Sequence, residues 1–412
     1  MGWETAKLGD VCELIKRGVA PKYIDEGGIC VINQKCIRDH AINLDLSRRH
    51  NDNAKQVNPE RYIRTGDVLV NSTGTGTLGR VAQIRSEPKE PTTVDTHVTI
   101  VRPKPGLFHQ IFFGYMLIQI EDEITSSGAG TSGQTELSRT VLETKFDVAY
   151  PRSITEQRRI VAILDEAFAA IDAAIANTQR NLQNARELFE SHLNTIFSQK
   201  GDGWVEKRLG DLIDIKHGFA FKSDFFSESG DFVLLTPGNF YEHGGYRDRG
   251  KKQKFYVGEI PDGFILTRGD FLIAMTEQAP GLLGSSIIAP ENERFLHNQR
   301  LGLAQSKPGT VWCNEFFFHQ FNTQIFREAV SREASGVKVR HTSPKKLQAI
   351  QVAFPATEAE QKHVADQLNQ LKKQTELLEL NYQRKLDALH ELKQSILQKA
   401  FSGQLTTQET AA

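Results

Sequence analysis

Two long stretches of the chain carry apolar residues at alternating spacings of three and four, and neither contains a glycine or a proline. They extend from about residue 155 to 197 and from about residue 357 to 401. This spacing keeps one apolar seam on the same side of a helix. Each stretch therefore predicts a continuous helix of about 42 residues, which is ~60 Å long at ~1.5 Å per residue.

A single amphipathic helix of this length cannot bury its seam against itself, so we expect the two helices to pair as an antiparallel coiled coil. Capping-box-like starts precede both, with Ser153 or Thr155 in the first and Thr357 with Glu360 in the second. The predicted pairing residues of the first helix are Leu164, Ile171, Ile175, Leu182 and Phe189. Those of the second are Leu368, Leu371, Leu378, Leu389 and Leu392, with Thr375 and Lys385 as polar members of the seam.

Short apolar or alternating runs, bounded by Gly, Pro, Asn and Asp, fill residues 3–150 and 204–353. Examples are "DVLVN" and "HVTIV" in the first part, and "DFLIAM" and "SSIIA" in the second. Such runs predict short β-strands, and brief helical runs follow late in each part. We therefore expect two α+β globular domains, each followed by one long helix.

An internal repeat with a period of about 200 residues organises the chain. "WETAKLGD" at 3–10 returns as "WVEKRLGD" at 204–211, and "YPRSITEQRRIVAIL" at 150–164 returns as "FPATEAEQKHVADQL" at 354–368. The chain is therefore predicted to contain two copies of one module, related by an approximate two-fold. The expected divisions are a globular domain at 1–152, a helical spacer at 153–200, a second globular domain at 201–355, and a helical spacer with a tail at 356–412.

Composition changes this picture little. The 50 Lys and Arg residues nearly balance the 51 Asp and Glu residues, so any basic surface must be local. The four cysteines, Cys12, Cys30, Cys36 and Cys313, form no C-x-x-C pair, so buried thiols are expected rather than a zinc site or disulfides. No apolar run approaches the ~20 residues of a membrane span, which favours a cytoplasmic protein without membrane contact.

One stretch imitates a cofactor motif. "NSTGTGTLGR" at 71–80 contains the G-x-G-x-x-G spacing at Gly74, Gly76 and Gly79, and Asp95 lies where a ribose-binding acid would follow. A dinucleotide-binding turn must open a helix, yet the residues after Arg80 alternate as in a strand. The second copy, "TEQAPGLLGS" at 276–285, lacks the glycine triplet. We therefore interpret the stretch as a loop between strands; binding of a nicotinamide cofactor would revive the enzyme hypothesis.

No constellation of catalytic residues accompanies it: the sequence has no N-P-P-Y or D-P-P-Y methyltransferase motif, no P-loop, and no H-E-x-x-H or G-x-S-x-G. The polar loops instead suit base-edge reading, in which Arg or Lys binds guanine, Asn or Gln binds adenine, and Ser and Thr adapt to either. The candidates in the first domain are Gln34, Lys35, Arg38, Ser72, Thr73, Thr75, Thr77, Arg80, Thr131, Ser132, Gln134 and Arg139. Those in the second domain are Asn239, Tyr241, His243, Arg247, Thr276, Gln278, Asn298, Gln299, Arg300, Lys338, Arg340, His341 and Thr342.

Several motifs together resemble the specificity subunit of type I restriction-modification enzymes. They are "PRSITEQRRIVAILDEAFAAID", its echo "PATEAEQKHVADQL", the triplets "TGD" and "RGD" before strands, and the ending "SILQKAFSGQL". The run "LLTPGNF", "AMTEQAPGLLG", "HNQRLG" and "SGVKVRHTSP" looks like one recurring kind of target recognition domain in that family. The resemblance covers essentially the whole chain.

The resemblance implies a non-catalytic reader of double-stranded DNA, in which two target recognition domains each bind one half of a split target. It also implies two methyltransferase subunits that carry S-adenosylmethionine, and restriction subunits that use ATP and Mg, with no cofactor in this chain. Because the loops of the two modules differ, we expect an asymmetric target. Two alternatives remain open. The chain could be a subunit that serves methylation only, or a coiled-coil adaptor whose two globular domains bind peptides.

Overall fold

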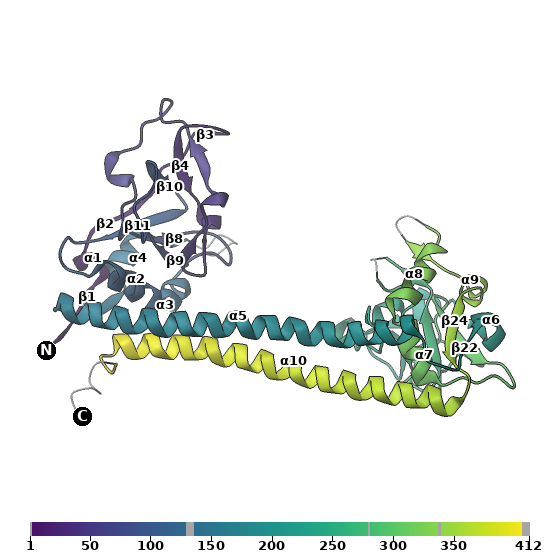
Figure 1. Cartoon of the computed structure of the whole chain (residues 1–412). Coiled ribbons are helices and arrows are strands. Elements are labelled where there is room, and N and C mark those ends of the chain that lie inside the picture. The colour runs from purple at the N-terminus through teal and green to yellow at the C-terminus, as the bar shows by residue number, and fades with distance from the viewer. Residues whose placement is uncertain (1, 129–135, 279–280, 337–338, 406–412) are drawn as a thin grey trace, which may run out of the picture. The chain divides into compact units, whose positions relative to one another are not determined.

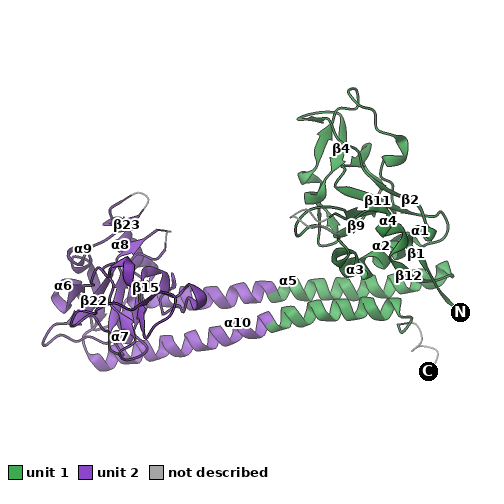
Figure 2. Cartoon of the chain, turned by 180° about the vertical axis from the view of Figure 1, so that it is seen from behind, with its two compact units in different colours: residues 1–178, 384–412 green, residues 179–383 purple. Residues whose placement is uncertain are grey.

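The structure is a computed structural model that describes residues 2–128, 136–278, 281–336 and 339–405. It divides into two compact units, one of residues 1–178 and 384–412 and the other of residues 179–383 (Figure 2). The division cuts both long helices, α5 (Ile154–Gln199) and α10 (Glu358–Phe401) (Figure 1). Each unit therefore contains one globular part and a segment of each helix.

Each unit contains an antiparallel four-stranded sheet of the same topology. In unit 1 the order is β2 (Cys12–Arg17), β11 (Val98–Pro103), β8 (Val68–Asn71) and β9 (Val81–Gln83). In unit 2 it is β14 (Ile213–His217), β22 (Leu301–Ser306), β18 (Phe271–Ala274) and β20 (Ser286–Ile288). The strands correspond one to one, which confirms the internal repeat.

A second four-stranded sheet, with one parallel strand pair, lies in each unit. Its order is β10 (Thr92–Val94), β4 (Ile29–Ile32), β7 (Arg48–His50) and β3 (Tyr23–Ile24) in unit 1. In unit 2 it is β15 (Phe226–Ser227), β17 (Phe255–Tyr256), β16 (Phe232–Leu234) and β21 (Phe295–Leu296).

Short strand pairs and helices complete each unit. The strand pairs are β1 (Trp3–Lys7) with β12 (Asp147–Pro151), β5 (Ile37–Arg38) with β6 (Ala41–Ile42), β13 (Trp204–Arg208) with β24 (Gln351–Pro355), and β19 (Thr276–Glu277) with β23 (Arg340–His341). The helices of unit 1 are α1 (Leu8–Val11), α2 (Gln110–Gln119), α3 (Glu121–Ser126) and α4 (Arg139–Thr144). Those of unit 2 are α6 (Leu209–Leu212), α7 (Asn314–Phe321), α8 (Gln324–Arg332) and α9 (Pro344–Gln348).

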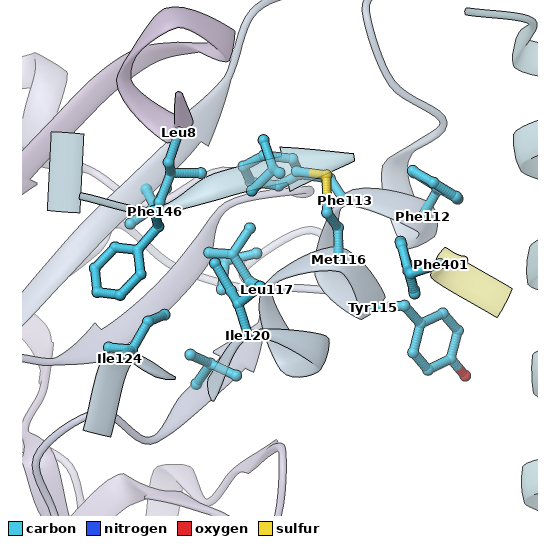
Figure 3. Packing of buried hydrophobic residues seen from close by; sticks show 14 of the residues in the cluster. Leu8, Phe112, Phe113, Tyr115, Met116, Leu117, Ile120, Ile124, Phe146 and Phe401 are labelled. Carbon is cyan, nitrogen blue, oxygen red and sulfur yellow. The ribbon is translucent and has the colours of Figure 1, made fainter. Parts of the chain in front are cut away.

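The long helices form part of each hydrophobic core. In unit 1, Ile160 near the start of α5 and Phe401 at the end of α10 join one buried cluster with α2. Figure 3 shows Phe112 beside Phe401, and their ring centroids are 5.1 Å apart. In unit 2, Phe197 near the end of α5 and Leu368 near the start of α10 share a cluster with α7. The start of each helix thus packs near the end of the other, which confirms the predicted antiparallel pairing.

The predicted seam of α5 agrees with the structure. Leu164, Ile171 and Leu182 are buried, and Ile175 and Phe189 are half-buried. The predicted seam of α10 consists of two rows of positions. The row that contains Leu368, Thr375 and Leu389 faces inward, since Leu368 and Thr375 are buried and Leu389 is half-buried.

The prediction is wrong for the other row of α10, which contains Leu371, Leu378 and Leu392. Leu378 is 40% exposed and Leu392 is 47% exposed, whereas Leu386 is buried and Lys393 reaches across to Asp172 of α5 at 2.7 Å. The row that packs is shifted by one residue, to Ala365, Lys372, Glu379, Leu386 and Lys393. Leu371, of the predicted row, is half-buried. Spacings of three and four are compatible with either of the two rows that flank the row of Leu368 and Thr375. The sequence pattern favoured the flanking row that is richer in leucine, and the other one packs.

The helix starts follow from local hydrogen bonds. Ser153, not Thr155, caps α5, because its hydroxyl oxygen accepts the amide of Glu156 at 3.4 Å. Thr357 caps α10 by accepting the amide of Glu360 at 3.3 Å.

All four cysteines are buried with free thiols, as expected. Among the described residues, no helix has the length and apolar content that crossing a membrane requires.

Candidate nucleic-acid interface

The glycine-rich stretch of the first domain connects two antiparallel strands. β8 ends at Asn71 and β9 begins at Val81, with no helix between them. Gly74, Gly76 and Gly79 all have positive φ, and the amide of Thr77 donates to the carbonyl of Gly74 at 3.2 Å. Only glycine adopts such angles without strain. The stretch is therefore a tight loop between strands, as predicted, and it lacks the helix N-terminus of a dinucleotide-binding turn.

Three predicted loops meet around the end of β8 in unit 1. The Asn71 side chain donates to the carbonyl of Gln34 at 3.1 Å, which joins the first loop to the second. The amide of Leu137 donates to the carbonyl of Ser72 at 2.8 Å, which brings in the loop before Arg139. Gln34, Ser72 and Leu137, which are far apart in the chain, thus lie together where β8 ends.

The corresponding loops meet around the end of β18 in unit 2. The amide of Met275 donates to the carbonyl of Arg300 at 2.9 Å, and the amide of Thr342 donates to the carbonyl of Met275 at 2.9 Å. Thr276 pairs with His341 where β19 lies beside β23. Three stretches that carry predicted DNA-binding residues are therefore joined by hydrogen bonds at the end of β18.

Glu277 organises the loop that follows, and sequence reasoning missed it. One carboxylate oxygen of Glu277 accepts the amides of Gly281, Leu282 and Leu283 at 2.9 to 3.0 Å. The other oxygen accepts a guanidinium N–H of Arg340 at 3.2 Å, and Glu277 is only 3% exposed. A buried carboxylate with this many donors holds the backbone of residues 281–283 in place. Arg340 is thus tied into the framework of the loop surface.

A matched pair of turns lies beside these loops. The side chain of Asp95 accepts the amide of His97 at 2.9 Å, and that of Asn298 accepts the amide of Arg300 at 3.0 Å. The carbonyl of His97 accepts the amide of Ser72, as that of Arg300 accepts the amide of Met275. His97 of unit 1 therefore occupies the position of Arg300 in unit 2.

Two glycines make this position possible. A Cβ on Gly18 would lie 1.9 Å from the carbonyl oxygen of Val94, and one on Gly218 would lie 2.0 Å from that of Asn298. No other residue fits such an approach. The signal was present in the repeat, because "KRGVA" at 16–20 aligns with "KHGFA" at 216–220 and "VDTH" at 94–97 with "HNQR" at 297–300. Gln299 and Arg300 were predicted as contacts from the sequence, whereas their counterparts Thr96 and His97 were not.

An aromatic and cationic group extends from a hairpin of unit 2. The rings of Tyr241 and His243 stack with centroids 5.2 Å apart, and the Arg247 guanidinium lies 5.8 Å from the Tyr241 ring. Partial burial of the ring, and then the charge of Lys372, lowers the pKa of His243 from its ordinary value. The matching hairpin of unit 1, between β5 and β6, carries Arg38 and His40 at these positions.

Comparison with known proteins now identifies the family. The family model described as "Type I restriction modification DNA specificity domain" matches residues 1–182 and again residues 201–387, together most of the chain. The chain belongs to this family. The two matches of the specificity domain coincide with the two copies of the repeat.

Individual relatives agree. The type I restriction enzyme EcoBI specificity subunit of Escherichia coli is 26% identical over 227 residues, which is 55% of this chain and 44% of that protein. The match thus spans less than half the length of that curated relative. A chain from the structure of a type I R-M system, solved to explain complex assembly and conformational transition, covers 98% of each chain at 19% identity with a TM-score of 0.77. The HsdS subunit of Thermoanaerobacter tengcongensis covers 98% of this chain and 97% of its own at 19% identity with a TM-score of 0.61.

Four of the predicted DNA contacts are buried, which corrects their role. The Ser72 hydroxyl lies 2.5 Å from that of Thr99, and the Asn239 amide donates to Gln253 at 3.0 Å. Asn298 forms the turn described above, and Thr342 is 7% exposed. Burial keeps these four side chains from a ligand, and those of Ser72, Asn239 and Asn298 form hydrogen bonds within the domains.

The other predicted contacts are accessible or lie outside the described residues. Exposed side chains are Lys35, Arg38, Thr75, Arg139, Tyr241, His243, Arg247, Gln278, Gln299, Arg300 and His341. Half-buried ones are Gln34, Thr73, Thr77, Arg80, Thr276 and Arg340. Thr131, Ser132, Gln134 and Lys338 lie outside the described residues.

Proposed function

We propose that the chain is the DNA-recognition subunit of a type I restriction-modification complex and that it reads a split, asymmetric target without catalysing a reaction itself. The observation that carries the proposal is a framework that is repeated while its loops differ. His97 stands where Arg300 stands, and Arg38 stands where Tyr241 stands. An imidazole and a guanidinium present different donors to a base edge. Two domains of this kind would read two different half-sites.

The proposed contacts are the exposed and half-buried side chains of the loop surfaces, with His97 and Thr96 added. Arg300 and Arg247 have the donors that guanine or phosphate needs, and Gln278 and Gln299 can bind adenine in the bidentate manner. The stacked Tyr241 and His243 rings offer a flat surface to a sugar or a base. The net charge of −1 gives little general attraction to DNA, so partner subunits would supply much of the phosphate contact.

The proposed partners are double-stranded DNA, two methyltransferase subunits that carry S-adenosylmethionine, and restriction subunits that use ATP and Mg. The relative from Escherichia coli, a subunit of a type I restriction enzyme, supports such partners in general. The chain itself would need no cofactor and would act in the cytoplasm. A role in methylation alone is the alternative within the family.

The decisive experiment is to express the chain with its methyltransferase partner and to map methylated bases across a host genome by single-molecule sequencing. We expect one recurring target with two unlike half-sites and a fixed spacer. Methylation at a single uninterrupted sequence would contradict a two-domain reader. In a mobility-shift assay with the partner present, retention of one bipartite duplex over a scrambled one separates this role from that of a peptide-binding adaptor.

A further inference from the structure

Each globular domain is fastened to the long helix that follows it by two hydrogen-bonded contacts at equivalent places in the repeat. We call these the first clamp, made by Gln157 and by Gln361, and the second clamp, made by Tyr115 with Asp165 and by His319 with Asn369. Each unit has its own copy of both clamps, and the residues that form each copy lie within that unit.

The first clamp is a buried glutamine in the first turn of the helix. The Gln157 carbonyl accepts the amide of His109 at 2.6 Å, and its NH₂ donates to the carbonyls of Leu107 and Pro151 at 3.2 and 2.9 Å. It is 0% exposed. All three partners lie outside α5, so this side chain fixes the entry of α2 onto the helix.

Gln361 repeats the arrangement in unit 2. Its carbonyl accepts the amide of Cys313 at 2.9 Å, and its NH₂ donates to the carbonyls of Val311 and Pro355 at 3.4 and 3.0 Å. It is also 0% exposed. The same residue type thus makes the same three kinds of contact before α7.

The second clamp lies eight positions further along each helix. The Tyr115 hydroxyl of α2 donates to the carboxylate of Asp165 at 2.5 Å, and Figure 3 shows this hydroxyl directed away from Leu117 and Ile120. In α7, the Nε2–H of His319 donates to the side-chain oxygen of Asn369 at 2.8 Å. The residue types differ between the units, yet each keeps a donor on the domain and an acceptor on the helix.

Two separated contacts constrain a domain more than one does. Eight residues of helix correspond to about 12 Å, and the two positions lie on the same side of the helix. A single contact would leave a pivot, whereas two contacts at this separation fix the angle between domain and helix. We propose that the paired clamps hold each recognition domain at one angle on its helix and so restrict the spacing between half-sites that the protein accepts. This inference rests on the proposed function.

The test uses the full chain with its methyltransferase partner and a set of duplexes with both half-sites fixed and the spacer lengthened or shortened by one base pair. The double variant Asp165→Ala, Asn369→Ala removes the helix side of both second clamps. Both positions are exposed and helical, where alanine is well tolerated. We expect methylation at the altered spacers, relative to the natural one, to rise about fivefold to tenfold, because each lost hydrogen bond weakens one orientation by this order.

Conservative variants and matched controls separate positioning from a general structural effect. Asp165→Asn and Asn369→Asp keep an acceptor oxygen, so we expect them to restore strict spacing. Gln183→Ala and Gln374→Ala, at exposed positions of the same helices, should leave spacing unchanged. Tyr115→Phe removes only the hydroxyl and provides a second, independent opening of the clamp in unit 1.

The readouts also separate this inference from the proposed function. If the wild-type complex selects no bipartite target, the proposed function is wrong. If it does, and the double variant and Tyr115→Phe fold normally and discriminate against altered spacers as strictly as wild type, the clamps do not set the spacing. A change in the sequence of a half-site would equally overturn the proposal, because no clamp residue is among the proposed DNA contacts.

Discussion

At the scale of single residues, Asp67 and Arg102 form a buried ion pair in unit 1. Two guanidinium nitrogens of Arg102 lie 2.7 Å from the two carboxylate oxygens of Asp67, and both side chains are almost fully buried. Arg102 also donates to the carbonyls of Glu60 and Tyr62. The pair therefore joins the start of β8 to β11 and to the loop before them.

Asp67→Asn should destabilise unit 1 by about 3–5 kcal/mol, since it leaves the charge of Arg102 buried without its counterion. Asp270 of the "RGD" triplet is the matched control, because it is half-buried and accepts the amide of Thr267 at 2.8 Å. Asp270→Asn should cost about 1 kcal/mol. Urea unfolding followed by circular dichroism measures both, and equal losses would contradict a special role for the buried pair.

His97 and Arg300 give a test of base reading. Arg300→Ala should change the base preference within one half-site, with a loss of about 1–3 kcal/mol in discrimination. His97→Ala should alter the other half-site and leave the first intact. Methylome mapping measures both results, and Arg268→Ala, at an exposed arginine three residues before β18, serves as the control. Changes in both half-sites from a single variant would argue against separate readers.

The buried histidine of the second clamp predicts a pH dependence. Burial lowers the pKa of His319 to about 4, whereas a histidine in an unfolded chain has a pKa of ~6.5. The unfolded state therefore takes up the proton first as the pH falls. The contribution to stability is complete above pH ~6.5 and declines by about 1.4 kcal/mol per pH unit between ~6.5 and about 4.

Unfolding of unit 2 at pH 7.5, 6.0 and 5.0 tests this expectation, and His297, whose pKa burial also lowers to about 4, adds to the same slope. His319→Gln keeps a donor for Asn369 and does not titrate. Its stability should depend less steeply on pH than that of wild type, and an unchanged slope would show that His319 is not the group responsible.

At the scale of elements, the position of the apolar seam decides which leucines of α10 stabilise the helix pair. Leu386 is 7% exposed and Leu392 is 47% exposed, and both belong to the segment of α10 in unit 1. Leu386→Ala should cost about 2–5 kcal/mol, whereas Leu392→Ala should change stability by less than about 0.5 kcal/mol. Chemical unfolding of the two variants checks the shifted row directly, and the reverse order would restore the row inferred from sequence.

At the scale of the whole molecule, the helices predict a ruler for the spacer between half-sites. Removing one heptad from both helices shortens each by about 10 Å, close to the length of three base pairs. Both must be shortened together to keep the antiparallel register. The methylated target should then have a different spacer and the same two half-sites, and an unchanged spacer in methylome mapping would defeat the idea.

The sequence by itself determined the features that depend on neighbouring residues. The periodicity after Ser153 and Thr357 predicted both long helices, the repeat predicted two domains of one fold, and the strand pattern after Arg80 excluded a dinucleotide-binding turn. Each of these signals lies within a few residues or within a direct comparison of the two copies, so local propensity and capping suffice to read them.

The tertiary structure decided the features that depend on residues far apart in the chain. It selected Leu386 over Leu392 for the seam, buried Ser72 and Asn239, and brought His97 to the position of Arg300. Burial and pairing depend on which distant element covers a side chain, and periodicity carries no record of that partner. The sequence therefore defined two similar domains on long helices, and only their packing decided which side chains the loops of these domains expose.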